Sequence, residues 1–163
     1  MTPKTILVPI SYAPSSVKAF GTAATLAASY GAKLIAMHVV RPPKKVFYSP
    51  GGLGFDELLE KTKIEESNRL DGFVKDNLEA ANVIVDVERM VLEGEDHVEL
   101  IIDVARKNGV DLIVVGHHEE MHLEHFLFGR DVDRIVDGAD CDVIVTRTRL
   151  YKELGRKKKK EAA

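Results

Sequence analysis

Residues 111–145 read DLIVVGHHEEMHLEHFLFGRDVDRIVDGADCDVIV, and this stretch decides the fold of the chain. The apolar run Asp111–Val115 predicts a buried strand that delivers Gly116 into a loop. Gly129 then precedes a helix over roughly Arg130–Gly138, and Asp142–Thr146 predicts another strand. α/β proteins usually bind anions where a strand opens into a glycine and a helix amino terminus, because unpaired N–H groups and the helix dipole favour negative charge. The stretch therefore predicts an α/β fold and a ligand site, with the alternative that Gly116 and Gly129 are turn residues that only end a strand and admit a helix.

The rest of the chain repeats this alternation of strands and helices. Apolar runs predict strands over Lys4–Ile10 and Lys33–Val40, and the alternating pattern of Val83–Val91 predicts an edge strand. Helices are expected over Val17–Tyr30, Phe55–Ala81 and His97–Lys107. The segment Arg41–Gly54, rich in proline and glycine, is expected to be a loop. Strand–helix alternation implies parallel pairing through right-handed crossovers, and therefore a doubly wound α/β fold.

In such a sheet, ligands bind outside the carboxyl ends of the strands. The predicted strand ends place Ser11, Val39 and Gly116 around one cleft. Ser11 opens a turn ahead of a helix in which Pro14 takes an early position, and Ser11 is expected to cap that helix, with a ligand contact as the alternative. His38 lies within a strand run and is expected to be a hydrogen-bonded core residue.

Composition limits the class of protein further. The chain has 163 residues and a formal net charge of -3, which suits one domain and gives no reason to expect nucleic-acid binding. Cys141 is the only cysteine, which excludes an internal disulfide and favours a reducing compartment and a structural thiol. No apolar run reaches membrane-spanning length, and the start MTPKTILVPI lacks the form of a signal peptide. We therefore expect a cytoplasmic protein.

Four segments together carry a resemblance to a known family. They are ILVPIS at 6–11, KLIAMHVV at 33–40, NGVDLIVVGHH at 108–118 and FGRDVDRIVDGADCDVIV at 128–145. In this order and spacing they resemble a universal stress protein domain, over the range from Lys4 to about Arg147. The resemblance implies one domain over residues 1–147 with strand order 3-2-1-4-5, followed by a basic tail at 148–163. It also implies a cytoplasmic stress-response protein that forms a homodimer along the last strand, Asp142–Thr146.

The resemblance also implies a set of nucleotide contacts. Nucleotide-binding members carry G-x2-G-x9-G-(S/T) after the fourth strand, and these positions fall on Gly116, Glu119, Gly129 and Arg130. The acidic adenine-side residue of the family falls at Ser11, directly after Ile10. A main-chain contact to adenine falls near Val39. His118 lies within the same loop. The candidate ligand site therefore consists of Ile10, Ser11, Val39, Gly116, His118, Glu119, Gly129 and Arg130.

Two departures from this motif change what the site is expected to bind. Glu119 stands where glycine would let the backbone approach phosphate, and Glu120 adds a second carboxylate nearby. A like charge beside a triphosphate costs on the order of 1 kcal/mol or more where water is partly excluded. Arg130 replaces a hydroxyl donor with a guanidinium that suits phosphate, and Asp131 behind it can occupy the helix amino terminus. Tight ATP binding is thus disfavoured, and a ligand with one phosphate is disfavoured less.

A second hypothesis concerns a metal. Four of the six histidines lie between His117 and His125, and residues 118–122 spell H-E-x-x-H. A protease is not expected, because the motif lacks a third ligand at the metzincin position. If the loop were helical, His118, His122 and His125 would share one face and could hold zinc, whereas the alternative is a polar surface loop.

The leading functional hypothesis is a dimeric universal stress protein that acts through interaction or small-ligand binding, without turnover. The first alternative is an ATP or AMP switch in which Arg130 replaces the usual hydroxyl contact. The second is a metal-binding module formed by the histidine loop.

Overall fold

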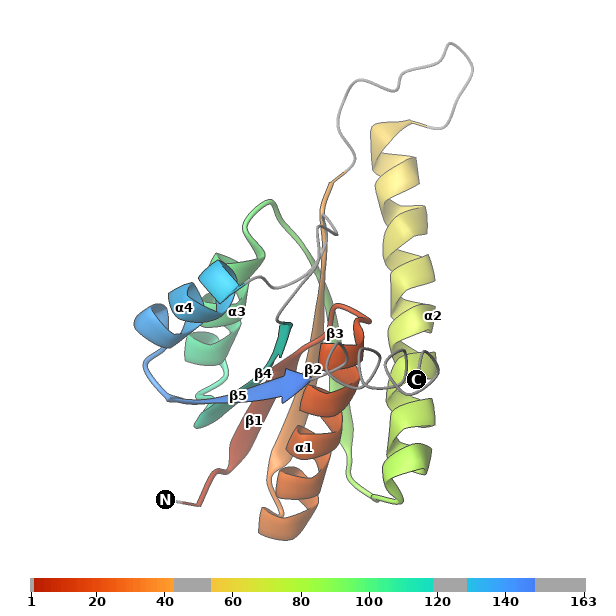
Figure 1. Cartoon of the computed structure of the whole chain (residues 1–163). Coiled ribbons are helices and arrows are strands. Elements are labelled where there is room, and N and C mark those ends of the chain that lie inside the picture. Colours follow the sequence, from red (N-terminus) through yellow and green to blue (C-terminus); the bar gives the residue numbers. More distant parts are fainter. Residues whose placement is uncertain (1, 43–53, 119–128, 149–163) are drawn as a thin grey trace, which may run out of the picture.

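A parallel sheet of five strands lies at the centre of the part of the chain that the structure describes (Figure 1). The structure is a computed structural model, and it describes residues 2–42, 54–118 and 129–148. The sheet consists of β1 (Thr5–Pro9), β2 (Lys33–Val40), β3 (Val87–Glu93), β4 (Leu112–His118) and β5 (Asp142–Thr148). Neighbouring strands pair in parallel in the order β3-β2-β1-β4-β5. The predicted doubly wound α/β fold and its strand order are confirmed.

Helices cover both faces of the sheet, as Figure 1 shows. α1 (Pro14–Tyr30) and α2 (Phe55–Ala81) pack on one face, where Ile6, Val8 and Phe20 belong to one buried cluster. α3 (His97–Lys107) and α4 (Gly129–Gly138) pack on the other face, over a cluster that includes Leu7. Successive side chains of β1 therefore pack into opposite cores, which is why the sequence of this strand is apolar throughout. None of the described helices is both long and apolar enough to span a membrane.

Local signals account for the helix ends. Pro14 begins α1 with its φ angle already suited to a helix, and Gly31 ends it in the left-handed conformation with φ 65°. Asp96 caps α3, since its carboxylate accepts hydrogen bonds from the N–H groups of Val98 and Glu99. The expectation that Ser11 caps α1 is wrong: the N-cap residue is Ala13, without a side-chain hydrogen bond.

The third strand begins later than the sequence pattern predicts. Val83 and Val85 pack against the core whereas Ile84 is 99% exposed, so these residues alternate as a strand would. However, β3 pairs with β2 from Val87 onward, opposite Leu34, near the start of β2. The residues before Val87 therefore have no strand to pair with. β3 does lie at an edge of the sheet, as predicted.

Gly116 lies inside β4 and not in a loop after it, which corrects the predicted strand end. It is in register with Thr146 of β5. A Cβ atom at this position would lie 2.5 Å from the carbonyl carbon of Ser15 and 2.9 Å from the Ser15 Cβ. Glycine is thus required here because the first turn of α1 packs directly against the β4 backbone.

We expect Gly116→Ala to lower the free energy of unfolding by about 1–3 kcal/mol, because backbone atoms of Ser15 would have to move. Gly21→Ala is the matched control: a Cβ there meets nothing within 4 Å, and alanine should stabilise α1 by about 0.5–1 kcal/mol. Urea unfolding of the two variants and the parent measures both effects. Equal stability of Gly116→Ala and the parent would contradict the packing argument.

Candidate functional site

A cleft of about 450 Å³ opens at the carboxyl ends of β1 and β2. Two helices complete its walls, α2 on one side and α3 on the other. The lining residues are Pro9, Ile10, Ser11 and Tyr12 after β1; Met37, His38, Val39, Val40 and Arg41 of β2 and its end; Thr62, Glu66 and Arg69 of α2; and His97 and Ile101 of α3. The position agrees with the rule that doubly wound sheets bind ligands at the carboxyl ends of their strands.

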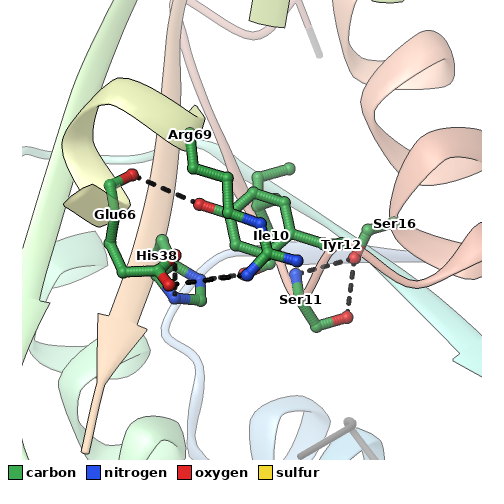
Figure 2. Close-up of polar contacts among 7 residues, drawn as sticks. All are labelled: Ile10, Ser11, Tyr12, Ser16, His38, Glu66 and Arg69. Carbon is green, nitrogen blue, oxygen red and sulfur yellow. Dashed lines mark hydrogen bonds and ion pairs between the residues drawn. The ribbon is translucent and has the colours of Figure 1, made fainter. Parts of the chain in front are cut away.

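A tight turn between β1 and α1 forms the floor of this cleft. The Ser11 N–H donates to Ser16 Oγ at 2.9 Å, and the two serine hydroxyl oxygens lie 2.8 Å apart (Figure 2). Tyr12 follows with φ 60°, a left-handed conformation that costs a non-glycine residue roughly 1–2 kcal/mol. The hydrogen bonds to Ser16 hold the chain in this conformation. The turn therefore fixes where the Tyr12 ring lies.

The Tyr12 ring is enclosed by three other side chains. The guanidinium carbon of Arg69 lies 3.9 Å from the ring centroid, which is a cation–π contact. The His38 ring lies 4.7 Å away and is tilted, and the Phe73 ring meets Tyr12 edge-on at 5.7 Å. The Tyr12 hydroxyl donates to the main-chain oxygen of Glu66 at 3.4 Å. Tyr12 thus joins the turn after β1 to the middle of α2.

Glu66 lies between a cation and a histidine. Its Oε1 is 3.4 Å from the Arg69 guanidinium, and its Oε2 is 3.4 Å from His38 Nε2 (Figure 2). His38 Nδ1 lies 2.8 Å from the carbonyl oxygen of Ile10. A carbonyl only accepts, so Nδ1 carries the hydrogen, and a neutral His38 has none on Nε2 to give to Glu66. Accordingly, Glu66 Oε2 is buried and accepts no hydrogen bond from the described residues.

This environment acts on the Tyr12 phenol. Burial raises its pKa most, and the charge of the Glu66 carboxylate raises it further, while Arg69 opposes the shift. Tyr12 therefore stays a neutral phenol over the physiological pH range. A neutral ring is the form that supports the guanidinium of Arg69 without forming an ion pair with it.

The opposite wall joins α3 to α4. His97 Nε2 lies 3.2 Å from Asp131 Oδ2, and both side chains are mostly buried. The guanidinium of Arg134 donates to Asp96 Oδ2 at 2.5 Å. This hydrogen bond is the main reason that the pKa of Asp96 is held below its ordinary value. Asp131 lies in the first turn of α4, as expected from the sequence.

The sequence-predicted site residues do not all reach this cleft. Ile10, Ser11 and Val39 line it, whereas Gly116 and Arg130 do not. Gly129 begins α4 and His118 ends β4. Glu119, His122 and His125 lie outside the described residues. Among the residues described, no cluster of three or more histidine, cysteine, aspartate or glutamate side chains could hold a metal, and the zinc hypothesis stays a prediction.

The structure shows the surroundings of His38 and Cys141, for which the sequence predicted structural roles. His38 is hydrogen-bonded as expected, but it also lines the cleft, which its place in a strand did not indicate. Cys141 is partly buried, and burial is the main cause that raises the pKa of its thiol, followed by the charges of Asp142 and Asp140. A thiol with a raised pKa is protonated and unreactive, in keeping with a structural role.

The chain matches a known protein family over nearly its whole length. The family model described as "Universal stress protein family" matches residues 2–147. The chain belongs to the universal stress protein family. A universal stress protein of Methanocaldococcus jannaschii is 30% identical over 144 residues, which covers 88% of this chain and 82% of the relative. The predicted family membership is confirmed.

Solved universal stress proteins share the fold. One, in complex with cAMP, has a TM-score of 0.63 and 22% identity, and the match covers 90% of this chain and 98% of that one. Another, from Archaeoglobus fulgidus in complex with dAMP, has a TM-score of 0.55 and 15% identity, with 89% and 98% covered. At these identities the likeness establishes the common fold alone.

We expect Tyr12→Phe to make this universal stress protein less sensitive to alkali. The folded state raises the pKa of Tyr12 above the ordinary 10.0, so it holds the phenol proton more tightly than the unfolded chain does. Stability is therefore lost as the pH rises above the pKa of the unfolded state. Urea midpoints between about pH 9 and pH 11 should fall less in Tyr12→Phe than in the parent. Tyr30→Phe, at an exposed tyrosine, is the control, and equal losses in Tyr12→Phe and the parent would contradict the expectation.

Proposed function

We propose that this universal stress protein acts by reversible binding of an adenine nucleotide with one phosphate in the cleft at the carboxyl ends of β1 and β2. The observation that carries the proposal is the size and lining of this cleft, about 450 Å³ between Ile10–Tyr12 and Val39–Arg41. Pockets for small molecules usually have about 300–1,000 Å³, mostly apolar walls and a few well-placed polar groups. In this proposal the protein binds the nucleotide without converting it, and a partner responds to the bound state.

Main-chain groups of Val39 supply the polar contacts expected for a base. The Met37 carbonyl accepts a hydrogen bond from the N–H of Ile10, so the main-chain groups of Met37 point toward β1. Alternate residues of a strand direct these groups to the same side, and those of Val39 therefore point the same way. β1 is paired only as far as Pro9, opposite Met37. The N–H and carbonyl of Val39 thus open into the cleft, where a purine edge can use both.

The choice of one phosphate over three rests on the departures from the family motif and on the relatives. Glu119 replaces a glycine of that sequence motif, and a carboxylate in a phosphate-binding motif disfavours a polyphosphate more than a single phosphate. The ligands named for two solved family members, cAMP and dAMP, carry one phosphate each. Both considerations favour AMP-like ligands over ATP for this chain.

A thermal-shift series tests this proposal. AMP should raise the melting temperature in a concentration-dependent way, and ATP with magnesium should raise it less at equal concentration. Val39→Phe should abolish the shift because the larger ring fills the cleft. Ile84→Phe, at a 99% exposed side chain near the amino end of β3, is the control and should respond like the parent. No shift with AMP, or a larger shift with ATP, would refute the proposal.

We also propose a homodimer along β5. Within the described residues this strand pairs only with β4, so the main-chain groups of its other edge are open to a second strand. Ile144 and Val145 on this strand are 37% and 38% exposed. An edge strand with exposed apolar side chains suits a self-complementary interface.

Ile144→Lys should therefore convert the dimer into a monomer, because each copy would place a charge in the apolar interface. Size-exclusion chromatography with light scattering measures the mass across a dilution series. Val136→Lys, at a 49% exposed side chain of α4, is the matched control and should remain dimeric. A parent protein that is monomeric at every concentration would rule out the β5 dimer.

A further inference from the structure

Two cations line the described part of the cleft, and they come from elements other than those that carry the glycines of the family motif. Arg41 follows the end of β2, and Arg69 projects from α2. Both side chains line the same cavity, whereas Gly116 and Arg130 do not. Phosphate recognition in proteins favours arginine, because its planar guanidinium can donate two hydrogen bonds to one anionic group.

Arg69 is held in place before any ligand arrives. Its guanidinium stacks on the Tyr12 ring at 3.9 Å, and Tyr12 is itself fixed by the turn that Ser11 and Ser16 close (Figure 2). The Arg69 side chain is still 58% exposed. Its remaining N–H groups can therefore bind an anion without the entropic cost of ordering a mobile side chain.

Glu66 is the one carboxylate that lines the described part of the cavity, and it interacts with both Arg69 and His38. It lies 3.4 Å from Arg69 and 3.4 Å from His38. Its more deeply buried oxygen, Oε2, faces His38 and not the guanidinium. Arg41, by contrast, has no ion pair with any described residue. The described lining of the cleft thus carries two arginines against one carboxylate.

In the described part of the chain, the surroundings of the glycine motif offer less to a phosphate. The β4 backbone at Gly116 is covered by the carbonyl group of Ser15, so its open face is occupied by protein. Asp131 brings a carboxylate into the first turn of α4 and lies 3.2 Å from His97. A helix amino terminus with a carboxylate already present is a poorer site for a second anion.

From this distribution of charge we infer that Arg41, at the end of β2, and Arg69, on α2, form a phosphate subsite in the cleft. The bound nucleotide then lies with its phosphomonoester toward these two arginines, and Arg69 is positioned by Tyr12 and Glu66. The inference rests on the proposed nucleotide binding, and it assigns the anionic end of the ligand to residues outside the glycine motif.

Paired titrations with AMP and adenosine test the subsite. The ratio of their dissociation constants, measured by calorimetry at low salt, reports the contribution of the phosphate alone. Arg41→Gln and Arg69→Gln should each reduce this ratio about tenfold, as expected for one charge-assisted contact that only AMP makes. Lys75→Gln, at an exposed position of the same helix, is the matched control and should keep the ratio of the parent.

Arg130→Gln tests the rival location beside the glycine motif. A ratio that falls in Arg130→Gln and survives in both Arg41→Gln and Arg69→Gln would place the phosphate beside the glycine motif and overturn the inference. Equal binding of AMP and adenosine to the parent would overturn it as well.

A titration with inorganic phosphate separates this inference from the proposed function. Side-chain Nε–H signals of Arg41 and Arg69 in nuclear magnetic resonance spectra should shift together with added phosphate, and those of Arg106 should not. If these shifts occur but neither AMP nor adenosine binds, the nucleotide proposal fails and the anion subsite stands. If phosphate shifts neither signal, the subsite is refuted whatever the nucleotide does.

Discussion

The turn that ends β1 is the constraint on which the rest of the site depends. Hydrogen bonds between Ser11 and Ser16 close this turn, and they allow Tyr12 to adopt a left-handed backbone. Because the chain leaves the sheet here, β2 continues beyond its neighbour, and the Val39 main chain faces open space. The same turn starts α1, whose first residues pack on Gly116 of β4. One local conformation thus opens the cleft, places its aromatic ring and joins two strands.

The order of the elements was predictable because each carries a strong local signal. A strand buried on both faces, such as Thr5–Pro9, must be apolar throughout, and capping and turn residues mark where helices begin and end. Strand limits were less predictable, because they depend on the neighbouring strand. Val83–Asp86 alternates like a strand but precedes the start of its partner, and β4 continues past Gly116 because β5 runs beside it.

The predictable part of the candidate site consists of the residues at strand ends. Ile10, Ser11 and Val39 follow from the rule on strand ends, although the sequence misassigned Ser11 as a helix cap. Glu66 and Arg69 were not identified, since they lie 54 and 57 positions after Tyr12 and look like ordinary exposed residues of an amphipathic helix. Their spacing of three places both on one helix face, which is the only signal that could have connected them. Only the packing of α2 on the sheet shows that this face meets Tyr12.

The left-handed backbone at Tyr12 also restricts which residues can occupy this position. A β-branched residue would be strained there, and glycine or asparagine would keep the bend yet leave the guanidinium of α2 without a flat support. The aromatic ring at position 12 and the arginine at position 69 therefore depend on each other, because loss of either removes the stacking contact.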